Sequence, residues 1–226
     1  FEVQLLHDGM SLESRPELAI LNGANAALVG SEIVQFTTAS LTAPGRYRLA
    51  GLLRGRLGTE RFMAAHGAGT RFVLLNGAVV AIERTLGALG APRQFKAVGP
   101  NESIAAVPAS SFTYDGENLR PLSPVHVRAD RAPNGDATLT WIRRSRQGFD
   151  WVDGADAPLA EESERYELDI LNAGTVVRTI ATTGPQAFYS AADQQADFGA
   201  PQAVLNLNLY QISATVGRGA PLNATL

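Results

Sequence analysis

Ala137-Thr-Leu-Thr-Trp-Ile-Arg-Arg-Ser145 is the stretch that decides the fold of the second half of the chain. Its first residues alternate between apolar and polar, which is the period-two pattern of a β-strand with one buried face. The cluster Pro133-Asn-Gly-Asp136 precedes it and is a hairpin signal. The stretch is therefore predicted to be a strand that follows a tight turn and has Trp141 in its middle.

Similar short strands are predicted on both sides of this stretch. They fall at residues 125–129, 165–171, 175–181, 187–191 and 206–216. Asn172-Ala-Gly174 supplies a second hairpin turn. In the last strand, Tyr210, Ile212, Ala214 and Val216 alternate on the face that we expect to point inward. About seven strands with frequent turns in ~105 residues are the signature of an immunoglobulin-like sandwich.

The first half also favours β-structure, because helical periodicity is almost absent from the chain. Strands are predicted at residues 32–36, 46–53, 70–75 and 94–98. In the second of these, Tyr47, Leu49, Gly51 and Leu53 are expected to share one buried face. A turn cluster and two prolines near residues 114–124 mark a break. The expected fold class is mainly β, with a small β-rich domain at 1–118 followed by a sandwich at 119–226.

Composition excludes several classes of protein. The 226 residues include no cysteine, which excludes a disulfide scaffold, a thiolate metal site and cysteine catalysis. A net charge of −3 gives no broad basic field for nucleic acid, so no nucleic-acid partner is expected. Lys96 is the only lysine among 19 basic residues, and arginine suits interfaces, although a GC-rich genome would give the same bias. A chain that starts at Phe1 rather than Met is expected to be part of a longer polypeptide.

Residues 119–226 resemble a fibronectin type III module. Trp141 lies mid-strand, where that family has its core tryptophan, and Tyr166 begins the next core strand. The segment from Leu209 to Gly219, which includes Tyr210, is similar to the penultimate strand of the module and the turn after it. The resemblance implies a sandwich fold and carries no information on function.

Seven longer strings point to a more specific family. They are Ala27–Phe36, Tyr47–Glu60, His66–Leu75, Leu119–His126, Trp141–Arg146, Asp150–Gly154 and Tyr189–Gly199. The most specific piece is Leu52-Leu-Arg-Gly-Arg-Leu-Gly-Thr59. Together the strings resemble the C-terminal part of the large tail-tip hub protein of tailed bacteriophages and gene transfer agents, which is labelled host specificity protein or megatron. Members of that family are far longer than this chain.

The resemblance implies a structural role. Three copies of the hub protein, a homotrimer, close the tail tube and form the central tip at the distal end of the tail of a virion or gene-transfer-agent particle. The implied partners are the other copies, further tail-tip or baseplate proteins, and a host surface receptor. The matching strings correspond to no active site in the family, so the resemblance implies no catalytic residue and no enzyme activity.

The string Arg54-Gly-Arg-Leu-Gly-Thr59 allows two interpretations. Its amides and its two arginines could grip an anion in a loop that glycines permit. The string lacks the spacing and the Lys-Ser/Thr ending of a phosphate-binding loop, so we favour a tight strand-to-helix connection with the arginines in ion pairs. Arg54, Gly55, Arg56, Gly58 and Thr59 then form a structural motif, and Thr59 begins a helical turn.

The remaining polar residues do not form a metal or catalytic pattern, so no metal, cofactor or catalytic residue is expected. Asp150, Asp153 and Asp156 recur at every third residue, but their register does not fit a calcium loop. His66 has no histidine or carboxylate nearby at ligand spacing, which favours a structural hydrogen bond. The basic residues Arg143, Arg144 and Arg146 are expected to stack on Trp151 or to pair with Glu161, Glu162 and Glu164.

Two other functions remain open beside the structural one. A carbohydrate-binding β-module would need a flat aromatic platform, for which Trp151 is the one candidate. Part of an envelope-degrading enzyme would need two carboxylates across a cleft, and the adjacent Glu161 and Glu162 offer no such pair.

Overall fold

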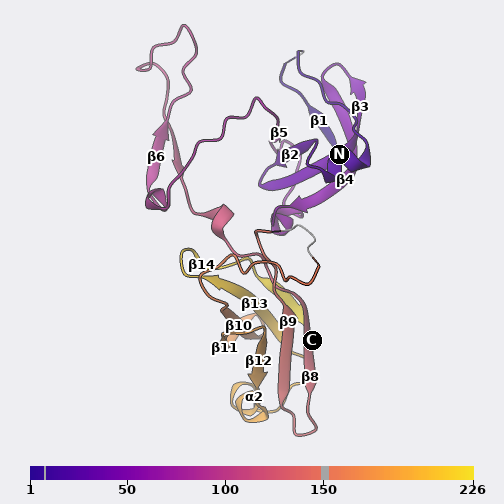
Figure 1. Cartoon of the computed structure of the whole chain (residues 1–226), viewed down its shortest axis with the longest axis vertical. Coiled ribbons are helices and arrows are strands. Elements are labelled where there is room, and N and C mark those ends of the chain that lie inside the picture. The colour runs from indigo at the N-terminus through magenta and orange to yellow at the C-terminus, as the bar shows by residue number, and fades with distance from the viewer. Residues whose placement is uncertain (8, 149–152) are drawn as a thin grey trace. The chain divides into compact units, whose positions relative to one another are not determined.

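The computed structural model describes residues 1–7, 9–148 and 153–226, and the chain forms two compact units, Phe1–Ile82 and Glu83–Leu226 (Figure 1). Nearly all elements are β-strands, and the two α-helices found in the described residues are short. The mainly β fold class predicted from the sequence is confirmed. No helix in these ranges is long and apolar enough to cross a bilayer.

The first unit is built on one antiparallel sheet with the strand order β1-β4-β3-β2-β5. The strands are β1 (Glu2–Gln4), β2 (Ala26–Val29), β3 (Glu32–Ala43), β4 (Arg46–Arg56) and β5 (Phe72–Leu74). A short helix, α1 (Glu17–Leu21), precedes β2, and a 3-10 turn, η1 (Glu60–Phe62), follows β4. One face of the sheet holds the core, which comprises Val3, Leu12, Ala27, Val29, Val34, Phe36 and Leu49.

Strand β4 changes the side that it presents to the core, in contrast to the alternation predicted for residues 46–53. Leu49 is buried, but Leu52 rather than Leu53 packs against the core. The change falls at Gly51, whose φ of +62° lies in the left-handed region. A Cβ atom at this position would lie 1.9 Å from the Thr37 Oγ1 atom. A glycine is therefore required where the β3–β4 hairpin reverses its faces.

Gly51→Ala is expected to destabilise the first unit by about 1–3 kcal/mol, because the new Cβ meets Thr37 and the left-handed backbone becomes strained. Urea denaturation followed by circular dichroism measures the change. Gly77→Ala is the matched control, since a Cβ there meets nothing within 4 Å and the change should stay within about 0.5 kcal/mol. Equal effects of the two substitutions would show that Gly51 is not needed for this reversal.

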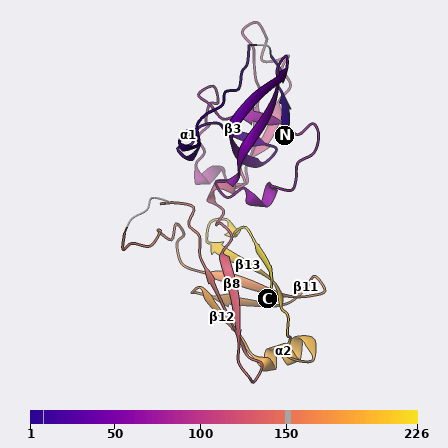
Figure 2. The same ribbon diagram turned by 90° about the vertical axis from the view of Figure 1, so that its right-hand side faces the viewer.

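The second unit contains a sandwich of two antiparallel sheets (Figure 2). One sheet has the order β12-β9-β8. In the other sheet, β10 lies between β11 and β13, and β13 also pairs with β15 along its first half and with β14 at its end. The bounds are β8 (Val125–Arg131), β9 (Ala137–Ile142), β10 (Tyr166–Asn172), β11 (Thr175–Thr182), β12 (Gln186–Tyr189), β13 (Asn206–Ser213), β14 (Gly217–Arg218) and β15 (Leu222–Thr225). A three-stranded sheet thus faces a five-stranded one in which β14 and β15 both pair with β13, and this is a fibronectin type III-like arrangement, as predicted.

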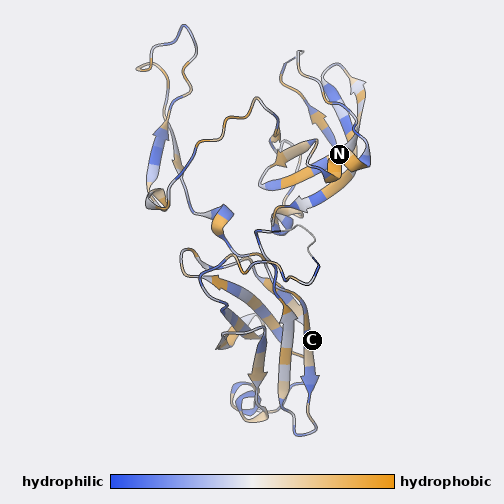
Figure 3. Cartoon of the chain, in the orientation of Figure 1, coloured by the Kyte–Doolittle hydropathy of each residue, from blue (hydrophilic) through white to orange (hydrophobic). Residues whose placement is uncertain are grey.

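The core of the sandwich forms from the inward residues of both sheets. Hydropathy alternates along these strands, as Figure 3 shows for β13. The largest fully buried side chains include Tyr166, Tyr189, Leu139, Leu168, Ile170, Leu205, Leu207 and Leu209. The helix α2 (Ala191–Phe198) lies at the β8–β9 turn, where the Ala191 N–H donates to Asp136 Oδ1 (2.7 Å) and the Gln194 amide donates to the Gly135 carbonyl (2.9 Å).

The inward face of β13 differs from the one predicted. Leu207, Leu209, Gln211 and Ser213 are buried, whereas Tyr210 and its alternate neighbours Ile212, Ala214 and Val216 are not. Two of the four buried side chains are polar, so the apolar pattern in the sequence marks the wrong face. The prediction that Tyr210 points into the core is therefore wrong.

Residues 83–118 join the second unit and not the first. They contain η2 (Leu86–Ala88), the hairpin of β6 (Pro92–Phe95) and β7 (Ser110–Thr113), and η3 (Glu117–Leu119). At the base of the hairpin, a Cβ atom on Gly116 would lie 2.7 Å from Val216 and 2.8 Å from Leu89, so these residues are in close contact. The compact units divide after Ile82, whereas the sequence break suggested a boundary at 118.

Candidate functional site

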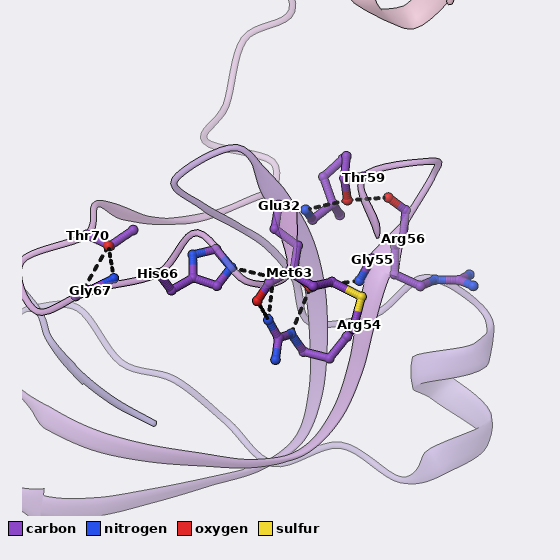
Figure 4. A network of polar contacts seen from close by, with 10 residues as sticks. Glu32, Arg54, Gly55, Arg56, Thr59, Met63, His66, Gly67 and Thr70 are labelled. Atoms are coloured by element: carbon purple, nitrogen blue, oxygen red, sulfur yellow. Dashed lines mark hydrogen bonds and ion pairs between the residues drawn. The ribbon is translucent and has the colours of Figure 1, made fainter. Parts of the chain in front are cut away.

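Glu32, the first residue of β3, is fully buried and is the centre of a polar network in the first unit (Figure 4). Its Oε1 atom accepts hydrogen bonds from Arg54 Nε (2.7 Å) and from the Gly55 N–H (2.7 Å). Its Oε2 atom accepts from Arg54 Nη2 (2.7 Å) and lies 2.5 Å from His66 Nε2. Both oxygens are therefore satisfied by positioned donors, as a buried carboxylate requires.

The fold brings these residues together from three segments. β3 and β4 are paired with Ile33 opposite Arg56, which places Arg54 and Gly55 beside Glu32. Arg54 Nη2 also donates to the Met63 carbonyl (2.8 Å), and His66 comes from the same segment, which follows η1. The network therefore ties residues 63–66 to the sheet.

The pKa of Glu32 shows that the network favours the ionised form. Burial on its own raises this pKa, but the hydrogen bonds from Arg54, His66 and the Gly55 N–H outweigh burial and lower it to about 2. Since an ionised carboxylate is acceptor-only, His66 Nε2 is the donor in its contact with Glu32. Glu32 is thus a fixed negative charge at neutral pH, held by Arg54.

The first unit is expected to lose stability in acid through Glu32. The pKa of Glu32 is ordinarily 4.5 and is about 2 in the folded chain. Its contribution to the free energy of unfolding is therefore complete above about pH 4.5 and is lost as pH falls toward 2. Glutamine does not titrate, so the difference in melting temperature between the wild-type chain and Glu32→Gln should narrow between about pH 7 and about pH 3. A difference that stays constant over this range would contradict the assignment.

The string Arg54–Thr59 forms a tight connection between β4 and the 3-10 turn η1. Gly55 has a φ of +60°, and a Cβ atom there would lie 2.8 Å from the Glu60 Cα atom. Gly58 also has a positive φ, of +82°. Thr59 Oγ1 accepts from the Ile33 N–H (2.9 Å) and donates to the Arg56 carbonyl (2.7 Å). These contacts fix the connection against β3.

The two arginines of the string have different partners. Arg54 is in the buried ion pair with Glu32, so two of its guanidinium nitrogens are engaged inside the protein. Arg56 Nε donates to the side-chain oxygen of Gln35 (2.8 Å), which is an amide and not a carboxylate. Binding of an anion by this loop would need these arginine nitrogens to be free, whereas the structure places them in contacts within the protein.

A cavity of about 310 Å³ lies next to the network. All five strands contribute residues to its wall, so the sheet curves around it. Its apolar lining includes Val3, Val29, Val34 and Phe72, and its polar lining includes Arg54 and His66. Its volume is at the lower end of the range of roughly 300–1,000 Å³ for ligand pockets.

Sequence spacing could not identify Glu32 as the partner of His66. The two residues are 34 positions apart, and the sequence shows no carboxylate near His66. The one available signal was that Glu32 begins a predicted strand with a buried face, where a charged residue needs a partner.

The aromatic residues of the sandwich have two different environments. Trp141 is 4% exposed and packs edge-on against Tyr166, with 5.2 Å between ring centroids. The Tyr166 hydroxyl donates to Glu164 (2.8 Å), and burial and this carboxylate raise its pKa. Tyr210 lies on the outer face, where the Arg218 guanidinium stacks on its ring at 4.5 Å. Trp141 and Tyr166 therefore belong to the core of the sandwich, and Tyr210 does not.

Two of the arginines after β9 pair with carboxylates, whereas Glu162 accepts from Thr215 Oγ1 (2.7 Å) and Glu164 accepts from the Tyr166 hydroxyl. Arg143 contacts Asp156 (2.6 Å), and Arg146 contacts the buried Glu161 (2.8 Å). Asp150 and Trp151, which the calcium and sugar-platform hypotheses involve, lie outside the described residues. Within residues 1–7, 9–148 and 153–226, no group of three or more His, Asp or Glu side chains is placed to hold a metal ion.

Comparison with solved structures finds distant similarities. The solved structures that resemble the chain include domains d3–d4 of the extracellular region of rat CD45, at 12% identity and a TM-score of 0.35, over 85% of this chain and 93% of that one. The FN5 domain of Drosophila Lar matches at 11% identity and a TM-score of 0.28, over 47% of this chain and 94% of that one. The comparison with curated protein sequences found no match.

The family comparison is more specific. Residues 1–73 match the model of a family described as Rcc01698-like, C-terminal. Residues 1–73 are therefore similar to an Rcc01698-like C-terminal domain, and they precede the fibronectin type III-like sandwich described above. The match includes Glu32, Arg54 and His66, so the whole polar network lies inside this domain.

Proposed function

We propose that this chain is a structural component of a phage-like tail tip, within the central hub or baseplate, where it helps to close the tail tube and to contact the host envelope. The observation that carries the proposal is the family match at residues 1–73. That segment contains two of the strings on which the resemblance to tail-tip hub proteins rests, Ala27–Phe36 and Tyr47–Glu60.

The exposed apolar side chains between residues 79 and 112 support an assembled role. They include Val80 at 82%, Ile104 at 68%, Leu86 at 62%, Ile82 at 61% and Phe112 at 55% exposure. Val80 and Ile82 belong to the first unit and Leu86, Ile104 and Phe112 to the second, so each unit has exposed apolar side chains that a partner protein would cover. A two-stranded hairpin such as β6–β7 is also only marginally stable in water unless it packs against something else.

The proposed partners are two further copies of the same chain in a homotrimer, other tail-tip or baseplate proteins, and a host surface receptor. The proposed location is the distal end of the tail of a virion or gene transfer agent. The role is structural and not enzymatic. Release of soluble fragments from purified cell envelopes by the chain would contradict the last statement.

A reconstruction of the intact particle tests the proposal. Density for the two units in three copies around the tail axis, at the distal tip, is the expected result. Six copies, or one copy away from the axis, would place the chain in a peripheral ring or fibre instead. Absence of the chain from purified particles would overturn the proposal.

A further inference from the structure

We propose that the first unit binds an extended peptide segment of another tail-tip protein, which adds to the free edge of β5 and places an uncharged apolar side chain in the cavity beside Glu32. The inference rests on the proposed function for the identity of the partner. Its physical basis is the edge of the sheet, the lining of the cavity and the pairing of its charges.

Both edges of the sheet lie at the cavity, and among the described residues neither edge strand pairs with a further strand. On β5, the Gly30 N–H donates to the Arg71 carbonyl and the Leu75 N–H donates to the Ala26 carbonyl. Because backbone direction alternates along an antiparallel strand, Phe72 and Leu74 direct their N–H and C=O groups away from β2. By the same alternation, Glu2 and Gln4 direct theirs away from β4.

The two edges differ in how well they are protected. Glu2 and Gln4 place charged and polar side chains along β1, and Glu2 pairs with Arg48 (3.0 Å), which is a common way to block an edge. The edge strand β5 consists of Phe72, Val73 and Leu74, and all three are only partly buried. An apolar edge of this kind is the one that a further strand would cover.

The cavity beside β5 suits an uncharged side chain. Its charged side chains are already paired, Arg54 with Glu32 and Glu2 with Arg48, so a charged group would find no free side-chain counter-ion among the described lining residues. Val29, Val34 and Phe72 supply apolar contact. A strand added beside β5 would place one of its side chains next to Phe72 on the cavity side of the sheet. Backbone pairing would then give affinity, and the cavity would select the side chain.

The first test uses the full 226-residue chain and a displayed library of random nine-residue peptides. We expect enrichment of peptides in which apolar residues alternate with other types. Ala68 is exposed on the wall of the cavity, and Ala65 is exposed nearby but does not line it. Ala68→Trp should weaken binding of an enriched peptide about tenfold or more by filling the cavity mouth, and the matched control Ala65→Trp should not.

The second test concerns the backbone. Leu74→Pro removes an outward N–H from β5 and leaves the bonds to β2, so it should also weaken peptide binding about tenfold. Gln4→Pro removes the corresponding N–H from β1 and should leave binding within about twofold. Circular dichroism of each variant must show an unchanged fold for its affinity to count.

Several results would overturn the inference. These are no enriched peptide, enrichment of charged peptides without alternation, equal binding by Ala68→Trp and Ala65→Trp, or loss of binding in Gln4→Pro alone. Self-association of the chain that Ala68→Trp abolishes would assign the edge to a second copy and overturn the proposed partner. Peptide binding does not depend on the particle, so a chain that lacks the proposed tail-tip location could still pass this test.

Discussion

Trp141→Ala is expected to lower the free energy of unfolding of the second unit by about 3–5 kcal/mol, which is a large part of the stability of a small domain. The side chain is 4% exposed and packs between the sheets against Tyr166. Its removal leaves a cavity that rigid strands on both sides cannot fill by collapse. Thermal unfolding followed by near-ultraviolet circular dichroism measures the loss.

Phe188→Ala is the matched control, because Phe188 is an aromatic residue of the adjacent strand β12 that is 56% exposed. Its substitution should change stability by about 0.5 kcal/mol or less. A melting curve that Trp141→Ala leaves unchanged would contradict the sandwich core described above.

Arg54→Met is expected to destabilise the first unit by about 3–5 kcal/mol, because it leaves the buried Glu32 carboxylate without its cation. The double variant Glu32→Met, Arg54→Met removes both charges and should recover a large part of this loss. Chemical denaturation of the wild-type chain, the two single variants and the double variant gives the coupling energy between the residues.

Arg48→Met provides the comparison for Arg54→Met. Arg48 lies on the same strand as Arg54, β4, and pairs with Glu2 of β1, but its side chain is 67% exposed, so its loss should cost at most about 1 kcal/mol. If Arg54→Met costs no more than Arg48→Met, Glu32 does not depend on Arg54 for its charge.

Most of the sandwich could be predicted from the sequence because each strand shows its own alternation and each hairpin its own turn. The strands β8 to β13 all lie within or close to the predicted ranges. The short strands β1, β2, β7, β14 and β15 are not predicted, since segments of two to four residues carry too little periodicity to be recognised. The burial of Gln211 and Ser213 in β13 depends on tertiary packing, which overrides the apolar pattern.

The polar network could be predicted only in part. The glycines of Arg54–Thr59 indicated a tight turn, and its arginines indicated ion pairs. The partner of Arg54 could not be identified, because the pairing of β3 with β4 decides which carboxylate lies beside it. The reversal at Gly51 was hidden for the same reason: its cause is the contact with Thr37 on the neighbouring strand.

The saturation of Glu32 also has an evolutionary consequence. Each of its oxygens already accepts hydrogen bonds from two donors. A mutation at position 32 therefore removes the carboxylate that Arg54 and His66 contact. A mutation at either donor leaves a buried carboxylate with a missing hydrogen bond, which destabilises the fold. Descendants that keep this domain are therefore expected to retain or replace the three positions as a set. Aligned sequences of such descendants should show correlated substitutions at 32, 54 and 66, while positions on the exposed Glu2–Arg48 pair drift independently.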